Sequence, residues 1–184
     1  MVGCDSLKVV ILVRIQVWQP VRFVYTLHME SPTVLVPHSN AWKVLYEKES
    51  TLIKEILGSY LMDIQHIGST SVPDLISKPI IDIALQIEKH IDADKFIEPL
   101  RALGYIYRSD LSSSERHFFQ KGNPVQFHLS ISYLDQGNYW RRQIAFRDYL
   151  TDHAEARREY EQIKLNSVDK SEFVQRILAL AESK

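Results

Sequence analysis

The chain contains one cysteine, Cys4, among its 184 residues. A single thiol excludes an internal disulfide framework and a zinc site built from cysteines. A chain without cysteine pairs suits a reducing compartment, so we expect a cytoplasmic protein. Long apolar runs are also scarce: the run from Val9 to Val13 is broken by Arg14 and Gln16, far short of the roughly 20 residues of a membrane span. We therefore expect no transmembrane helix, no secretory signal and no membrane partner.

An excess of one charge is missing as well. Lysine and arginine number 22, aspartate and glutamate number 23, and the net charge is -1. This balance does not give the basic surface that binds nucleic acid, and it implies no broadly basic partner. Apolar residues make up 45% of the chain, which is ordinary for a globular protein of one domain. We interpret residues 1–33 as a poorly specified N-terminal extension, because Val9 to Val17 shows no clean alternation, and residues 34–184 as the domain.

The most informative stretch is residues 66–83, which read HIGSTSVPDLISKPIIDI. Gly68 permits backbone angles that a side chain would forbid, so that successive N–H groups can converge on an anion. The hydroxyls of Ser69, Thr70 and Ser71 can add to that cradle, and Lys78 supplies a positive charge nearby. This pattern favours a phosphate-binding turn.

Asp82 follows within the apolar run from Ile80 to Leu85. An ionised carboxylate is unfavourable there unless it meets a cation, a metal ion or several hydrogen-bond donors. We therefore expect Asp82 to have a partner, either in a functional site or as a structural ion pair.

These residues resemble the core motif of the GrpB family, which is placed in the nucleotidyltransferase superfamily. The resemblance extends from about Val34 to Ala181 and includes LGY at 103–105, FHL at 127–129 and FRDYL at 146–150, followed by Tyr160 and Lys164. It implies an α+β (α/β) fold, with a nucleotidyltransferase-like mixed β-sheet flanked by helices and a helical C-terminal part. Some family members are joined to dephospho-coenzyme A kinase, which implies a link to coenzyme A or nucleotide metabolism.

The periodicity of the chain predicts its elements. We expect helices at 40–57, from Asp92 or Asp94 to Gly104, at 138–152, at 153–166 and from Asp169 onward; and strands at 61–67, 79–87, 105–107, 116–120 and 125–133, the last two forming an antiparallel hairpin.

Three further residues are candidates for the site. His128 and Ser130 share one face of their strand, and His128 beside Asp82 could hold a metal ion or relay a proton; a purely structural histidine is the alternative. His66 at the strand end is open to the same two interpretations. Arg147 stands in the family's FRDYL segment, where it could clamp a phosphate or pair with Asp82 or Asp148.

Four positions depart from the family pattern. The superfamily places a second acid two residues after the first, about 6.6 Å away on the same strand face, but this chain has Ala84 there. Ser130 replaces a histidine, Gln65 a glutamate and Asp74 a glycine. We expect a short helical or irregular link at 72–77, and in the first turn of such a helix a negative charge at Asp74 would also repel a phosphate bound at the helix start.

Two functions follow from this pattern. The first is a nucleotidyltransferase-like enzyme that binds a nucleotide or phosphorylated small molecule through Gly68, Ser69, Thr70, Ser71, Lys78 and Arg147, with Asp82 and His128 as catalytic residues that hold Mg²⁺ or Mn²⁺. The alternative is a non-catalytic nucleotide- or phosphate-binding or regulatory domain that has lost the carboxylate pair.

Overall fold

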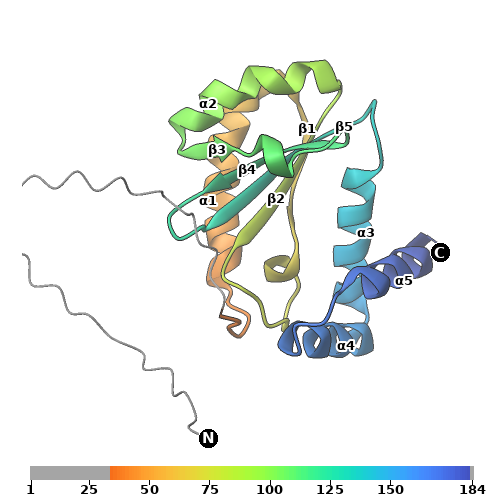
Figure 1. The fold of residues 1–184 in the computed structure, drawn as a ribbon. Helices are drawn as coiled ribbons and strands as arrows, with labels where there is room; N and C mark the ends of the chain where they lie inside the picture. The colour runs from red at the N-terminus through yellow and green to blue at the C-terminus, as the bar shows by residue number, and fades with distance from the viewer. Residues whose placement is uncertain (1–33, 183–184) are drawn as a thin grey trace, which may run out of the picture.

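The computed structural model describes residues 34–182, and the expectations for residues 1–33 lie outside them. The described residues form a five-stranded mixed sheet with helices on both faces (Figure 1), which confirms the α+β class. No described helix is long and apolar enough to cross a membrane.

The strand order is β1-β2-β5-β4-β3. The β2–β5 pair is parallel, and the other three neighbouring pairs are antiparallel. The strands are β1 (Leu61–Ile67), β2 (Ile81–Ile87), β3 (Tyr105–Tyr107), β4 (Arg116–Lys121) and β5 (Phe127–Tyr133). The predicted hairpin is confirmed as β4–β5. Strand β2 begins two residues later than expected, because Ile80 N–H donates to the Lys78 carbonyl in a turn.

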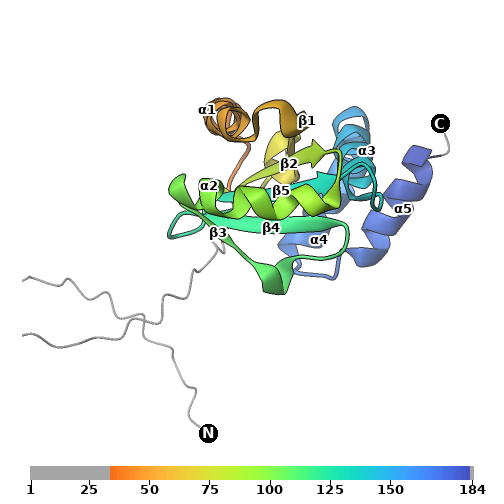
Figure 2. The same ribbon diagram turned by 90° about the horizontal axis from the view of Figure 1, so that it is seen from above.

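The helices fall into two groups on opposite faces of the sheet. Helices α1 (Ala41–Leu57) and α2 (Ile97–Ala102) cover one face, and α3 (Tyr139–Asp152), α4 (Ala154–Leu165) and α5 (Ser171–Glu182) lie together beside the other. Figure 2 shows the three C-terminal helices grouped at one side of the sheet, as seen from above.

The alternation of β2 and β5 sorts apolar from polar side chains. Ile81, Ile83, Leu85 and Ile87 join the main core with residues of α1 and α2, such as Trp42, Ile53 and Leu100. The even-numbered residues therefore face α3–α5, because successive strand side chains point to opposite faces. A second core joins these three helices to the segment after the turn at Gly68; it contains Val72, Leu75, Leu150, Ala156, Tyr160, Phe173 and Ile177.

Three details of the helices differ from the sequence prediction. The helical spacing of the apolar residues in α1 and α5 predicts buried faces that include Leu45, Leu52 and Leu180, but these side chains are exposed by 44%, 41% and 42%. In α1, Glu49 is buried, and its carboxylate pairs with Lys121 of the sheet at 2.7 Å.

The segment from His90 to Phe96 is a 3-10 helix, and neither Asp92 nor Asp94 caps it with its side chain. Both carboxylates have other partners: Asp92 pairs with Lys95 at 2.6 Å, and Asp94 accepts from His117 at 3.0 Å. Pro99 falls in the first turn of the short α2, where no helical N–H partner is required, so it does not kink the helix.

Candidate functional site

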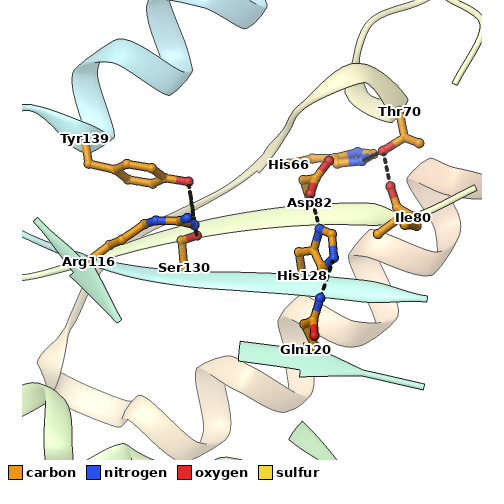
Figure 3. Close-up of polar contacts among 9 residues, drawn as sticks. All are labelled: His66, Thr70, Ile80, Asp82, Arg116, Gln120, His128, Ser130 and Tyr139. Atoms are coloured by element: carbon orange, nitrogen blue, oxygen red, sulfur yellow. Dashed lines mark hydrogen bonds and ion pairs between the residues drawn. The ribbon is translucent and has the colours of Figure 1, made fainter. Parts of the chain in front are cut away.

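A row of polar side chains crosses three neighbouring strands on the face toward α3–α5 (Figure 3). Asp82 of β2, His128 of β5 and Gln120 of β4 are register partners. His128 Nδ1 lies 2.9 Å from Asp82 Oδ1, and His128 Nε2 lies 3.2 Å from Gln120 Nε2. Gln120 Oε1 accepts from Arg108, so its amide nitrogen is the donor to His128. Consequently Nδ1 of His128 carries the proton that is donated to Asp82.

This row brings the two candidate residues Asp82 and His128 together, but it leaves the histidine no ring nitrogen for a metal ion. Both ring nitrogens of His128 bond to protein atoms, and neither offers a lone pair to a metal ion. Asp82 keeps one oxygen, Oδ2, without a hydrogen-bond partner among the described residues, and Ala84 supplies no second carboxylate on this face. Among the described residues no three His, Cys, Asp or Glu side chains gather in a group that could hold a metal ion.

A divalent metal therefore does not fit this donor set. Mg²⁺ and Mn²⁺ prefer several oxygen ligands, whereas the Asp82 carboxylate is shared with a histidine and stands among cationic side chains. Two cations that line the same cavity as Asp82, Arg116 and Lys170, would repel a dication.

The turn after β1 packs closely against Asp82. Gly68 has φ +68°, and a Cβ built on it would lie 2.3 Å from Asp82 Oδ2. Only glycine satisfies both the backbone angle and this contact. Ser69, Thr70 and Ser71 then form one 3-10 turn.

The three hydroxyls of this turn have different roles. Thr70 is buried, donates to the Ile80 carbonyl at 3.1 Å and contacts His66 Nε2 at 3.0 Å. Ser71 donates to the Gly68 carbonyl at 2.6 Å. Only Ser69 among the three has no hydroxyl partner in the described part of the chain, and it lines the cavities that contain Asp82. The expected cradle is thus a turn held by two of its hydroxyls, with the third available to a ligand.

His66 belongs to the support of that turn. Its ring stacks on Tyr46 at 5.0 Å between centroids and bonds to Thr70. Burial lowers the pKa of His66 to about 4, against the opposing effect of Asp82. The imidazole is therefore neutral at pH 7. Its contacts with Tyr46 and Thr70 are those of a structural histidine that supports the turn.

Arg147 is not brought to Asp82. Its guanidinium pairs with Asp148 at 2.7 Å and donates to Gln65 Oε1 and to the His66 carbonyl, both at 3.0 Å. It lines a separate cavity of about 560 Å³ on the other side of the turn. Of the two expected carboxylate partners the structure selects Asp148, and Arg147 ties α3 to the edge strand β1.

Gln65 and Asp74, two of the departures from the family pattern, also lie at this separate cavity. Asp74 has φ +63°, a left-handed conformation that explains why glycine suits the position. No helix begins at Asp74, since residues 72–77 form turns and a single bridge. The expected repulsion of a phosphate at a helix start therefore does not arise.

Two adjoining cavities form a cleft between the sheet and α3–α5. Their volumes are about 340 Å³ and 860 Å³, and they share Ser69, Asp82, His128, Tyr160 and Lys170 as lining residues. We call the larger cavity the lysine end, because Lys78 and Lys164 line it. We call the smaller one the arginine end, because Arg116 lines it beside Ser130 and Tyr139.

Lys164 reaches the lysine end from α4. Its ammonium donates to the Ile76 carbonyl and lies 3.4 Å from Ser77 Oγ. Burial, with a smaller contribution from Lys170, lowers the pKa of Lys164 to about 8. The ammonium is still protonated at pH 7 and can attract an anion.

Three residues that line the cleft were not expected from the sequence: Arg116 and Tyr139 at the arginine end and Lys164 at the lysine end. Arg116 could have been found from strand alternation. It lies an even number of residues from Gln120 on the same strand, so both side chains point to the face that carries His128, the register partner of Gln120. Tyr139 and Lys164 come from helices, and strand periodicity could not place them.

Comparison with known proteins agrees with the resemblance seen in the motifs. The family profile described as "GrpB protein" matches residues 32–179. The chain is 37% identical over 142 residues to the glutamate-rich protein GrpB of Alkalihalophilus pseudofirmus, covering 74% of this chain and 82% of that protein. It is 30% identical over 142 residues to YqkA of Bacillus subtilis, covering 77% of this chain but 41% of that protein.

Among solved structures, GrpB from Enterococcus faecalis is similar with a TM-score of 0.73 and 28% identity, covering 80% of this chain and 96% of that one. The Cid1 poly(U) polymerase with bound MgGTP is similar at 14% identity and a TM-score of 0.49, covering 70% of this chain and 43% of that one. So distant a similarity carries no activity over to this chain. The matching profile and the relatives together show that the chain belongs to the GrpB family.

Proposed function

We propose that this protein binds a nucleotide or another phosphorylated small molecule in the cleft, and that binding requires no divalent metal. The observation that carries the proposal is the charge of the cleft. Lys78, Lys164 and Lys170 line its lysine end, and Asp82 is the single carboxylate among the lining residues of the cleft. Such an excess of cations attracts phosphate groups.

The walls suit an organic ligand as well as a free anion. Phe146 and Tyr160 line the arginine end, and Ile163, Leu165 and Val168 line the lysine end. Ligand sites are commonly apolar with a few placed polar groups. Ser69 Oγ and Asp82 Oδ2 are the polar groups at the centre, the first a donor to phosphate and the second an acceptor for a hydroxyl or an N–H.

The alternative activity, metal-dependent nucleotidyl transfer, lacks support from the donor set. That reaction needs positioned metal ions to neutralise the charge of the transferring phosphoryl group, and Ala84 removes the second carboxylate. The non-catalytic binding domain is therefore the function that this geometry supports best.

A relative suggests which ligands to test. The dephospho-CoA kinase of Mycolicibacterium paratuberculosis is 27% identical over 167 residues, covering 77% of this chain and 41% of that protein. We therefore include dephospho-coenzyme A and coenzyme A beside ATP, UTP, AMP and inorganic phosphate.

Calorimetric titration of the full chain with this panel tests the proposal, once with Mg²⁺ and once with a chelator. We expect binding in both conditions, weakened in Lys164→Met and Lys170→Met and unchanged in Lys48→Met, an exposed cation of α1. Absence of binding to every compound contradicts the proposal. Binding that requires both Mg²⁺ and the Asp82 carboxylate, tested with Asp82→Asn, supports the transferase instead.

A further inference from the structure

Arg116 of β4 is held in a fixed position at the arginine end of the cleft (Figure 3). Its guanidinium carbon lies 4.5 Å from the centre of the Phe118 ring and 5.0 Å from that of the Tyr139 ring. Its Nη1 donates to Ser130 Oγ at 2.9 Å and lies 3.5 Å from the Tyr139 hydroxyl. Two aromatic contacts and a serine therefore fix the plane of the guanidinium.

The charge of Arg116 is not neutralised within the described residues. All of its hydrogen-bond acceptors are uncharged oxygens, the third being the Leu111 carbonyl at 3.4 Å. Arg142 lines the same cavity but is paired with Glu115. Burial raises the pKa of Tyr139, so its hydroxyl supplies no negative charge at pH 7 either.

Such a guanidinium is prepared to bind an anion. Arginine has five N–H donors, and the protein contacts of Arg116 leave Nε and part of Nη2 without a partner in the described chain. Because the side chain is already ordered, little rotamer entropy remains to be lost when a ligand binds. The stacked plane also favours the paired hydrogen bonds that carboxylates and phosphates accept.

Arg116 lies on the far side of Asp82 from the lysine end. Ser130, which holds Arg116, is opposite Ala84, about 7 Å further along β2 than Asp82. Lys78 precedes Asp82 in the chain and lines only the lysine end. The two cationic ends are therefore separated by on the order of 10 Å, with Ser69 and Asp82 between them.

We propose that the arginine end is a second anion subsite, and that the ligand carries two separated acidic groups, as a bisphosphorylated small molecule does. One phosphate lies at Lys78 and Lys164, the other lies at Arg116, and a hydroxyl between them donates to Asp82. The inference rests on the proposed function, which requires only the phosphate at the lysine end.

Two matched pairs of probes test the second subsite by calorimetry: adenosine 3′,5′-bisphosphate against adenosine 5′-monophosphate, and fructose 1,6-bisphosphate against fructose 6-phosphate. We expect the bisphosphate of at least one pair to bind at least about tenfold more tightly, and Arg116→Met to abolish that advantage while leaving the monophosphate affinity unchanged. Arg141→Met, which removes an exposed charge from α3, should change neither.

Arg116→Lys provides a second variant if Arg116→Met folds poorly. It keeps the charge but loses the planar donor pair, and we expect it to retain only part of the bisphosphate advantage. Equal affinity of wild type for both members of each pair, or equal loss of both in Arg116→Met, overturns the second subsite. If monophosphate binding still depends on Lys164 in that case, the proposed function stands; if no probe binds, both fail.

Discussion

The contact between Gly68 and Asp82 leads to a sharp prediction about stability. In Gly68→Ala the new Cβ would lie 2.3 Å from Asp82 Oδ2 and 2.9 Å from both Cβ and Cγ of Asp82. Gly58 provides a matched control, because it also has positive φ, +53°, and its Cβ would meet nothing within 4 Å. The two substitutions thus share the backbone strain and differ in the steric clash.

The expected magnitudes follow from these two contributions. A side chain in such a glycine conformation costs about 1–3 kcal/mol, which is the whole effect at Gly58. Forcing a methyl group against Asp82 adds about 1–3 kcal/mol at Gly68. Gly68→Ala should therefore lower the unfolding free energy by about 4 kcal/mol and the melting temperature by about 8–16 °C, and Gly58→Ala by about half as much.

Urea unfolding measures the clash directly. It is applied to Gly58→Ala, Gly68→Ala, Asp82→Ala and the double variant Gly68→Ala/Asp82→Ala. Removing the Asp82 carboxylate should recover at least about 1 kcal/mol of the loss, which appears as a coupling energy between the two sites. Equal destabilisation at Gly58 and Gly68, together with additive effects in the double variant, would refute the close packing of the turn on Asp82.

Three other measurements test further features. Lys121→Met leaves Glu49 buried without its partner and should cost about 3–5 kcal/mol in urea unfolding, most of which Lys121→Met/Glu49→Gln should restore. Burial lowers the pKa of His66 from 6.5 to about 4, so the unfolded chain binds more protons between these pH values; the unfolding free energy should fall as pH decreases through this window, and less steeply in His66→Gln. The pKa of Lys164, about 8, predicts that phosphate affinity decreases as pH rises through 8, and Lys164→Arg should remove that dependence. An unchanged affinity between pH 7 and pH 9 in the wild type would argue against Lys164 as a phosphate contact.

The local sequence pattern was sufficient to place much of the sheet and to put Asp82 and His128 on the same face of it. β1 has the predicted bounds, and the hairpin forms as the turn residues indicated. The structure places His128 beside Asp82, because alternation puts both side chains on the polar face and the parallel register sets them opposite each other. Periodicity of two residues is a property of the strand itself, so the sequence alone could reveal it.

Partners that come from another layer of the fold could not be predicted in this way. Arg147 bonds to Gln65, 82 residues earlier, because α3 crosses β1 at that place. Glu49 of α1 can be buried because its carboxylate pairs with Lys121 of β4 at 2.7 Å, whereas Leu45 and Leu52 of the same helix are exposed. Such contacts depend on where a helix docks, which no local spacing encodes.

The cleft itself shows the same division. The sequence by itself determined the Gly68 turn, the single acid at Asp82 and the missing second acid at Ala84, because these lie within one short stretch of chain. Only the tertiary structure decided that Arg116 and Lys164 line the cleft with Asp82 while Arg147 lies behind the turn. Long cationic side chains reach several ångströms from their backbones, and the packing of α3–α5 against the sheet fixes which of them meet the same cavity.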